Sequence, residues 1–348
     1  MSGGFSLFRS DLEHIVREAE ASWPALAGGS ILVTGGTGFF GMWLVEGLLW
    51  ADTALGLGLH VSVLSRDGAR FLAGRGRHLA GHPALTVLTG EAASFAPGGR
   101  AFTHIIHAVT ESHAGHSAAR HLETALGGTA HVIDIAAEHG TGAVLLTSSG
   151  AVYRHADPAQ AGAHAEGPAG RADYTGFAAV YAEAKRMAET MLAAGGERHG
   201  FRGAIARCFA FSGAWLPLDG GLALGDFLRD ALAGRDVAVS GDGTALRSYL
   251  YGADLVVWLL AILTRGADCR PYNVGSAEAV SIAGLAGLVA EAAGRPGRVI
   301  VHGRPAPGTA PHAYLPDVRR ATEELGLRRT VGLEDSIRRS LAWYRGRA

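Results

Sequence analysis

The chain has 348 residues, of which 48% are hydrophobic and 18% are charged, and its net charge is −1. This composition is ordinary for a globular enzyme, and it lacks the basic field that would attract nucleic acid or an anionic membrane. Two cysteines exclude a disulfide framework and fit a reducing compartment. No apolar stretch reaches the ~18 residues that a transmembrane helix needs, and the N-terminal residues lack the order of a signal peptide, so we expect a cytoplasmic protein.

An amphipathic helix is predicted over residues 11–21, where Leu12, Ile15 and Ala19 fall on one face. Short apolar runs follow and alternate with longer helical stretches. The runs cover residues 30–34, 60–64, 85–88, 103–107, 143–147 and 203–209, and the helices cover residues 42–51, 117–139 and 179–195. This alternation predicts an α/β fold of the Rossmann type, a doubly wound parallel sheet covered by helices on both faces.

The pattern loosens after about residue 213, where a turn-rich segment precedes a predicted helix over 223–233 and a strand over 237–239. We expect an N-terminal helical extension over 1–29 and a Rossmann cofactor-binding domain over 30–212. A smaller C-terminal substrate-binding lobe is expected mainly over 213–348, interleaved with the first domain. Residues 65–82 and 154–178 are rich in Gly, Ala and His and are expected to be exposed loops.

The first apolar run leads directly into a glycine-rich turn, Thr34-Gly35-Gly36-Thr37-Gly38-Phe39-Phe40-Gly41, and then into an apolar helix. This order of elements places a pyrophosphate at a helix N-terminus. Gly35 allows the tight turn, Gly38 lets the backbone approach a phosphate, and Gly41 lets the helix pack on the strand. The turn therefore predicts a dinucleotide site, and a second signal downstream makes this prediction specific.

That second signal is Tyr181-Ala-Glu-Ala-Lys185, which follows the pair Ser148-Ser149. Tyr181 and Lys185 lie four residues apart on a predicted helix, so both point to one face. A lysine near a tyrosine hydroxyl favours the phenolate and makes the tyrosine a usable acid or base. Ser149 follows the strand predicted over 143–147 and can donate to the same substrate oxygen. We predict Ser149, Tyr181 and Lys185 as the catalytic residues.

These segments resemble the short-chain dehydrogenase/reductases, specifically the extended branch that modifies nucleotide sugars. Residues 145–153 (LLTSSGAVY) resemble the serine strand of that family, and Tyr181 and Lys185 fall on its catalytic pair. Residues 241–254 resemble the segment whose arginine, here Arg247, grips the nucleotide diphosphate. The resemblance implies a nucleotide-diphosphate sugar as substrate, and Arg304 is a second, weaker candidate for the diphosphate.

The resemblance also implies the cofactor contacts. Where NAD-dependent members usually carry a carboxylate for the ribose, the chain has Ser65 followed by Arg66. An arginine there can pair with a 2′-phosphate, which favours NADP(H), while Asp67 keeps NAD(H) as the alternative. Glu91 falls where relatives carry an aspartate that meets adenine. The remaining cofactor contacts are expected at Gly35, Thr37, Gly38, Phe39, Phe40, Gly41, Ala108 and Lys185.

The chain differs from the family at the positions that determine which reaction is catalysed. The 4,6-dehydratases carry an Asp-Glu pair directly after the catalytic hydroxyl, and the decarboxylases carry a glutamate in that segment, but this chain has Gly150 and Ala151. Neither side chain can act as an acid or base, so dehydration by the usual route is disfavoured. Glu111-Ser112 nevertheless resembles a sugar-contacting loop of the dehydratases; the alternative is a solvated helix N-terminus. Ala210 also replaces an asparagine that often meets the substrate.

We therefore predict an NDP-sugar 4-epimerase that works through a transient 4-keto sugar and a bound NAD(P). The main alternative is an NADPH-dependent NDP-4-keto-sugar reductase. An NDP-sugar 4,6-dehydratase and a non-catalytic cofactor-binding protein are less favoured, the latter because Ser149, Tyr181 and Lys185 are intact. We expect a homodimer, with no nucleic-acid or membrane partner. We also expect no metal site, since no His, Cys or carboxylate set has ligand spacing.

Overall fold

The computed structural model describes residues 4–109, 118–153, 163–167, 179–305, 308 and 311–347. Its centre is a parallel sheet with the strand order β11-β6-β5-β4-β1-β2-β3. The strands of this sheet are β1 (Ser30–Thr34), β2 (His60–Ser65), β3 (Leu85–Thr89), β4 (His104–His107), β5 (Ala143–Ser149), β6 (Arg202–Cys208) and β11 (Pro271–Val274). The predicted Rossmann-type, doubly wound sheet is confirmed, and β1 to β6 each begin and end within two residues of a predicted run.

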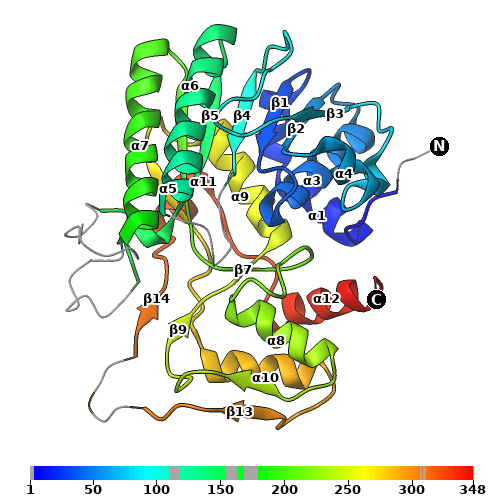
Figure 1. Cartoon of the computed structure of the whole chain (residues 1–348), viewed down its shortest axis with the longest axis vertical. Helices are drawn as coiled ribbons and strands as arrows, with labels where there is room; N and C mark the ends of the chain where they lie inside the picture. The colour runs from blue at the N-terminus through cyan, green and yellow to red at the C-terminus, as the bar shows by residue number, and fades with distance from the viewer. Residues whose placement is uncertain are drawn as a thin grey trace.

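Helices cover both faces of the sheet (Figure 1). On one face α1, α3, α4 and α9 bury their apolar side chains in one continuous core, and on the other face α6 and α7 form a second core. The helices of this half are α1 (Arg9–Glu18), α2 (Trp23–Leu26), α3 (Phe39–Leu55), α4 (Gly68–Ala73), α5 (Ala118–Leu122), α6 (Gly128–His139), α7 (Val180–His199), α9 (Gly252–Arg265) and α11 (Arg319–Leu325). Short helical turns are η1 (Glu20–Ser22), η2 (Arg77–Leu79), a π-helical turn η3 (Glu123–Gly127) and η4 (Gly150–Tyr153).

The predicted amphipathic helix is present as α1, where Leu12 and Ile15 are fully buried against α3 and α9. The expectation of an exposed loop over 65–82 was wrong, because α4 and η2 lie there and bury Phe71 and Leu79. The second loop expectation, over 154–178, lies largely outside the described residues.

A second, smaller layer lies below the sheet in Figure 1 and has its own apolar core. Its helices are α8 (Ala223–Leu232), α10 (Ile282–Ala292) and α12 (Leu333–Arg345). Its short strands are β7 (Phe211–Ser212), β8 (Val237–Val239), β9 (Leu246–Arg247), β10 (Leu250–Tyr251), β12 (Val280–Ser281), β13 (Val299–Val301) and β14 (Ala313–Tyr314). The chain crosses between the layers more than once, since α9 and β11 return to the large sheet after β7 to β10.

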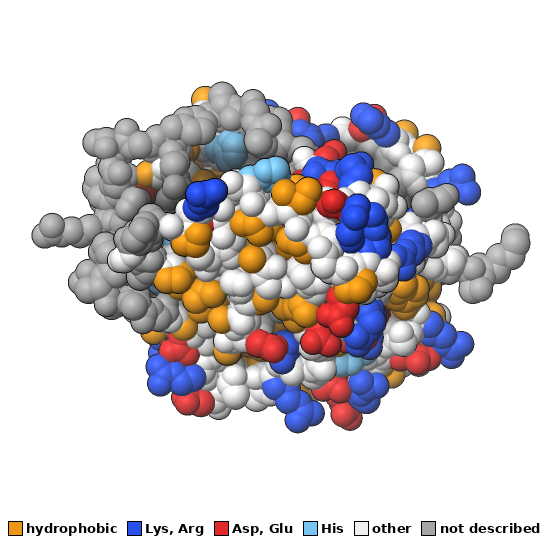
Figure 2. Space-filling view, turned by 90° about the horizontal axis from the view of Figure 1, so that it is seen from below, with side chains coloured by type: hydrophobic (Ala, Val, Ile, Leu, Met, Phe, Trp, Pro, Cys, Tyr) orange, Lys and Arg blue, Asp and Glu red, His pale blue; other side chains and the backbone are white. Residues whose placement is uncertain are grey.

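The outer face of this lower layer carries side chains of both charges around apolar ones, without a field of one sign (Figure 2). The exposed apolar side chains of this layer include Leu222, Ile300 and Val301. Within the described part of the chain, no helix combines the length and the apolar character needed to cross a bilayer.

Candidate active site

A cavity of about 1260 Å³ lies where the carboxyl ends of the sheet strands face the lower layer. Its walls include Gly35 after β1, Ser65 at the end of β2, Ala108 after β4, Ser149 at the end of β5 and Phe209 after β6. In open α/β sheets, ligands bind at this edge because the loops and helix N-termini converge there. The topology therefore brings together residues that are more than 100 positions apart in the sequence.

The glycine turn has the geometry of a phosphate cradle. Gly35 has a φ of +70°, and a Cβ atom there would lie 2.5 Å from the Ala108 carbonyl oxygen. A Cβ at Gly41 would lie 2.3 Å from the Gly35 oxygen, so Gly41 allows α3 to pack on the turn and does not itself line the cavity. A Cβ at Gly38 would meet only one atom, the Gly35 oxygen at 3.3 Å.

Among the described residues, no side chain caps the first turn of α3. The Gly38 N–H donates to the Gly35 carbonyl at 3.0 Å, whereas the N–H groups of Phe39 and Phe40, which lie at the cavity wall, can donate to an anion. These residues fit the pyrophosphate of a dinucleotide.

The adenosine end of this cradle is lined by Ser65, Arg66 and Glu91. Asp67 is not part of the wall, because its Oδ1 accepts the Arg70 N–H at 2.9 Å and caps α4. Glu91 accepts a charge-assisted hydrogen bond of 3.0 Å from Arg120. Within the described residues, the end of β2 therefore offers the cavity a hydroxyl and a guanidinium rather than a carboxylate.

Ser149, Tyr181 and Lys185 all line the same cavity. Ser149 is the last residue of β5, and Tyr181 and Lys185 lie one turn apart near the start of α7. Lys185 is buried, and its Nζ donates to the Thr147 carbonyl at 2.9 Å. That bond uses one of the three ammonium donors and leaves the others for ligands. The Ser149 Oγ accepts the Ala151 N–H at 3.1 Å, which fixes the serine side chain at the end of the strand.

A buried histidine lies beneath these residues. His107 ends β4, and its Nδ1 lies 2.8 Å from the Thr34 hydroxyl. Burial, reinforced by the charge of Lys185, lowers the pKa of His107 to about 3. The imidazole is therefore neutral at physiological pH, so His107 adds no second positive charge beside Lys185.

The space beside Gly150, the residue after Ser149, is occupied by side chains from distant parts of the chain. A Cβ at Gly150 would lie 2.7 Å from the Phe209 ring and 2.7 Å from the Tyr314 hydroxyl. The Phe209 and Tyr314 rings pack together with their centres 4.7 Å apart, and the Tyr314 hydroxyl also interacts with Ser149. Burial raises the pKa of Tyr314, so this hydroxyl keeps its proton. An aspartate at residue 150 has no room in this arrangement.

A buried polar network holds β5 and the segment after it. Glu189 on α7 accepts the Ser148 hydroxyl and pairs with Arg207, whose Nη2 lies 2.7 Å from the Glu189 Oε2. Arg207 also donates to the Tyr153 hydroxyl at 2.8 Å, and Tyr153 donates to Asn273 at 2.9 Å. Burial raises the pKa of Tyr153 to about 12. These hydrogen bonds tie β5, α7 and the turn after β5 to one another.

Arg247 lies on the substrate side of the cavity. Its Nη1 donates to the Leu246 carbonyl at 2.7 Å, and its Cζ lies 5.7 Å from the centre of the Tyr314 ring. Among the described residues Arg247 forms no salt bridge with Asp242 or Asp254. Asp242 accepts hydrogen bonds from Thr244, and Asp254 accepts them from the loop that precedes α12.

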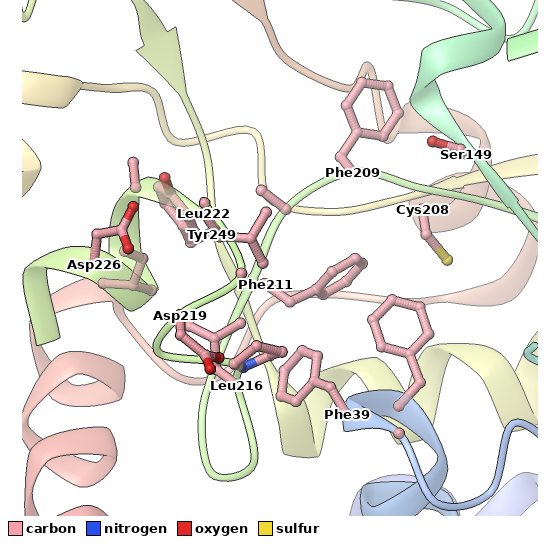
Figure 3. A pocket seen from close by; sticks show the side chains of 18 of the residues that line it. Phe39, Ser149, Cys208, Phe209, Phe211, Leu216, Asp219, Leu222, Asp226 and Tyr249 are labelled. Atoms are coloured by element: carbon pink, nitrogen blue, oxygen red, sulfur yellow. The ribbon is translucent and has the colours of Figure 1, made fainter. Parts of the chain in front are cut away.

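Arg304 is exposed and does not line the cavity, so the structure does not bring it together with Arg247. Glu111 and Ser112 lie outside the described residues. Ala210 lines the cavity between Phe209 and Phe211. Figure 3 shows Phe39, Phe209, Phe211 and Tyr249 around this space, with Asp219 and Asp226 at the end away from Ser149.

The sequence did not predict Tyr314 or Phe209 as site residues. Tyr314 reaches the site because β14 pairs with β9, a contact that no local pattern signals. The one available signal was Gly150 itself, since a glycine beside a catalytic serine leaves a space that another side chain must fill.

The family model for the NAD dependent epimerase/dehydratase family matches residues 31–275. The chain belongs to this family. A dTDP-glucose 4,6-dehydratase of Streptomyces griseus is 29% identical over 331 residues, which cover 90% of this chain and 93% of that protein. UDP-glucuronic acid decarboxylase 1 of Xenopus tropicalis is 27% identical over 320 residues, covering 90% of this chain and 72% of that protein.

Solved structures of other members have the same fold. The dTDP-glucose 4,6-dehydratase DesIV of Streptomyces venezuelae, with NAD bound, aligns with a TM-score of 0.75 at 25% identity, over 91% of this chain and 97% of that one. A UDP-glucuronic acid 4-epimerase of Bacillus cereus aligns with a TM-score of 0.76 at 18% identity, over 91% of this chain and 99% of that one. At this lower identity, the likeness concerns the fold alone.

Proposed function

We propose that the protein is a nucleotide-sugar oxidoreductase and, most simply, an NDP-sugar 4-epimerase. Members of the family named above act on UDP-glucuronic acid or dTDP-glucose, which supports a nucleotide sugar as substrate. The observation that carries the proposal is the occupation of the space at Gly150 by Phe209 and Tyr314 beside intact Ser149, Tyr181 and Lys185.

Tyr181, Lys185 and Ser149 have different roles in the oxidation of a carbinol carbon. Tyr181 takes the hydroxyl proton and later returns it, and Lys185 stabilises the phenolate form and contacts the cofactor ribose. Ser149 can donate its hydroxyl proton to the substrate oxygen while its Oγ accepts the Ala151 N–H. A bound nicotinamide would supply the hydride acceptor and donor for this step. A 4-epimerase results when the 4-keto sugar turns over in the site before the hydride returns.

Elimination of water needs an acid and a base at neighbouring carbons, and the site lacks them beside Ser149 in the described residues. The carboxylates that line the cavity belong to other regions, and four of them already accept hydrogen bonds from Arg120, Arg229, Arg235 or Thr244. Figure 3 has Asp219 and Asp226 far from Ser149. Oxidation and reduction need only Ser149, Tyr181 and Lys185, so they are favoured over dehydration.

The second candidate, a 4-keto-sugar reductase, is favoured by the end of β2. Arg66 lines the cavity, while Asp67 is engaged at the start of α4. Both features support NADP(H), whose 2′-phosphate a guanidinium binds well, although DesIV was solved with NAD. An epimerase can use either cofactor, since it returns the hydride, whereas a reductase consumes NADPH.

For the substrate diphosphate we propose Arg247 as the principal cation, because it lines the cavity and makes no ion pair with the described carboxylates. Arg304 stays a weaker proposal, since it is exposed. Glu111 and Ser112 stay proposals for the sugar. We also propose a homodimer through α5 and α7, which pack side by side and expose Leu122 and Met187.

The proposal is tested by incubating the protein with UDP-, dTDP- and GDP-hexoses that carry deuterium at C4. A 4-epimerase gives the C4 epimer with deuterium retained at C4 and no net change in cofactor. A reductase shows no turnover with these alcohols at catalytic cofactor, but consumes NADPH when a 4-keto sugar nucleotide is supplied. Formation of a 4-keto-6-deoxy sugar would contradict both.

A further inference from the structure

Arg75, on the loop after α4, lines the cofactor side of the cavity without belonging to any sequence motif. Its Nη1 donates to the carbonyl of Thr37 inside the glycine turn, and its Nη2 donates to the carbonyl of Trp215, each at 3.1 Å. The guanidinium also stacks on the Trp215 indole, with Cζ 4.6 Å from the ring centre. Arg75 therefore spans the gap between the phosphate cradle and the loop that leads to the lower layer.

Trp215 is itself held in an uncommon conformation. Its φ is +67°, in the left-handed region that a bulky side chain rarely adopts. The preceding carbonyl, of Ala214, accepts the Trp43 indole N–H at 2.8 Å. Backbone strain of this kind persists where surrounding contacts fix it, and it gathers at ligand sites. Arg75 contributes one of those contacts, and so its guanidinium has a defined position.

The charge of Arg75 is not balanced within the part of the chain that the structure describes. Its contacts are two carbonyl oxygens and an indole face, and a second arginine, Arg347, lies over the same indole with its Cζ at 4.3 Å. The Arg75 side chain is exposed and lines the cavity, so a ligand can reach its guanidinium. A guanidinium that lies beside an anion cradle, with no carboxylate partner among the described residues, is suited to bind an anionic ligand there.

We propose that Arg75 binds the pyrophosphate of the dinucleotide cofactor, opposite the backbone N–H groups of the glycine turn. Two of the five guanidinium N–H donors go to Thr37 and Trp215, which leaves the others for phosphate oxygens. The contact with Thr37, a residue of the turn, favours the pyrophosphate over the 2′-phosphate that we assign to Arg66. The inference rests on cofactor binding by this family and not on the reaction that the protein catalyses.

The test is the dissociation constants of NAD and NADP for the full-length protein freed of cofactor, with no sugar present. Arg75→Gln removes the charge but keeps a donor for one carbonyl, Arg75→Lys keeps the charge, and Arg77→Gln is the control. Arg77 is two residues away, exposed and outside the cavity wall. We expect Arg75→Gln to weaken both dinucleotides by roughly 10- to 100-fold, as the loss of a charged hydrogen bond does. We expect Arg75→Lys to recover part of the affinity and Arg77→Gln to match the wild type.

The dissociation constants measured at several salt concentrations give a second readout, because salt weakens binding that depends on a charged contact. The Arg75→Gln variant should lose part of that salt dependence. A loss confined to NADP would move the contact to the 2′-phosphate and overturn the pyrophosphate assignment. Dissociation constants within about twofold of the wild type would overturn the whole proposal. An equal loss in Arg75→Gln and Arg75→Lys, with a lowered melting temperature in both, would make Arg75 a structural brace only and would also overturn it. None of these results depends on epimerase activity.

Discussion

The hydroxyl of Tyr314 stands 2.7 Å from the point where a side chain at Gly150 would begin. This close approach brings β14 against the turn η4 that follows β5, and it places a neutral hydroxyl beside Ser149 where related dehydratases are expected to carry an acid. The absence of an acid at this position is the reason that we favour oxidation and reduction over dehydration.

Restoring an acid at residue 150 should not create a dehydratase. Gly150→Asp forces a side chain into the Phe209 ring and the Tyr314 hydroxyl, so we expect the free energy of unfolding to fall by about 1–3 kcal/mol. The measurement is urea unfolding, together with a search for a 4-keto-6-deoxy product. Combining Gly150→Asp with Phe209→Ala opens the space. The double variant should therefore lose less stability than the sum of the losses in the two single variants. Full stability of Gly150→Asp would show that the space is not occupied.

Removing only the Tyr314 hydroxyl should lower turnover without unfolding the protein. Tyr314→Phe keeps the ring packing on Phe209, but it removes the group that interacts with Ser149. We expect kcat to fall by roughly tenfold, the worth of one hydrogen bond at the reacting oxygen, with little change in melting temperature. Tyr249→Phe is the matched control, since Tyr249 is also buried and lines the same cavity. Equal effects of the two substitutions would argue against a role for Tyr314 at Ser149.

Nucleoside diphosphates alone should stabilise the protein through Arg247. A ligand that binds only the folded state raises the melting temperature, and Arg247→Ala should remove most of that rise. Arg304→Ala tests the weaker candidate, which is exposed and outside the cavity wall, and should reduce the rise less than Arg247→Ala does. A panel of UDP, dTDP, GDP, CDP and ADP also identifies the base. If none of them shifts the melting temperature, the substrate is not a nucleotide sugar.

Stability should fall below about pH 6.5 because His107 resists protonation. The pKa of His107 is lowered from 6.5 to about 3 in the folded protein, so between these values the unfolded chain takes up a proton that the folded chain refuses. The contribution of neutral His107 to the free energy of unfolding is fully present above pH 6.5. It declines as the pH falls toward 3, by at most ~1.4 kcal/mol per pH unit. His107→Gln should flatten this slope in urea unfolding, whereas the exposed His60→Gln should not. An unchanged slope in His107→Gln would mean that His107 is protonated in the fold.

Much of this architecture could be predicted from the sequence. The first six strands are short apolar runs closed by glycine or polar residues, and such runs mark buried parallel strands clearly. The glycine turn, Ser149, Tyr181 and Lys185 stand out by local spacing, and the structure brings these residues to one cavity, while their roles stay predictions.

The rest depends on contacts between distant segments. Strand β11 was missed because Pro271–Val274 is short and follows the irregular lobe, yet it completes the large sheet beside β6. Tyr314 and Arg75 reach the cavity only through pairing and packing of distant elements. A local sequence pattern contains no information about such distant neighbours. The sequence therefore showed that residue 150 is not an acid, but it did not show that Phe209 and Tyr314 occupy the space beside it.

The central claim is that the site oxidises and reduces a sugar carbon without removing water. Its most direct test is turnover of UDP- and dTDP-hexoses in D₂O, with the products followed by proton NMR. Oxidation and return of hydride at C4 exchange no other carbon-bound proton, so the account predicts the 4-epimer with no deuterium at C5 or C6. Deuterium at C5, or a 4-keto-6-deoxy product, would require an acid–base pair that the site beside Ser149 does not supply, and would contradict the account.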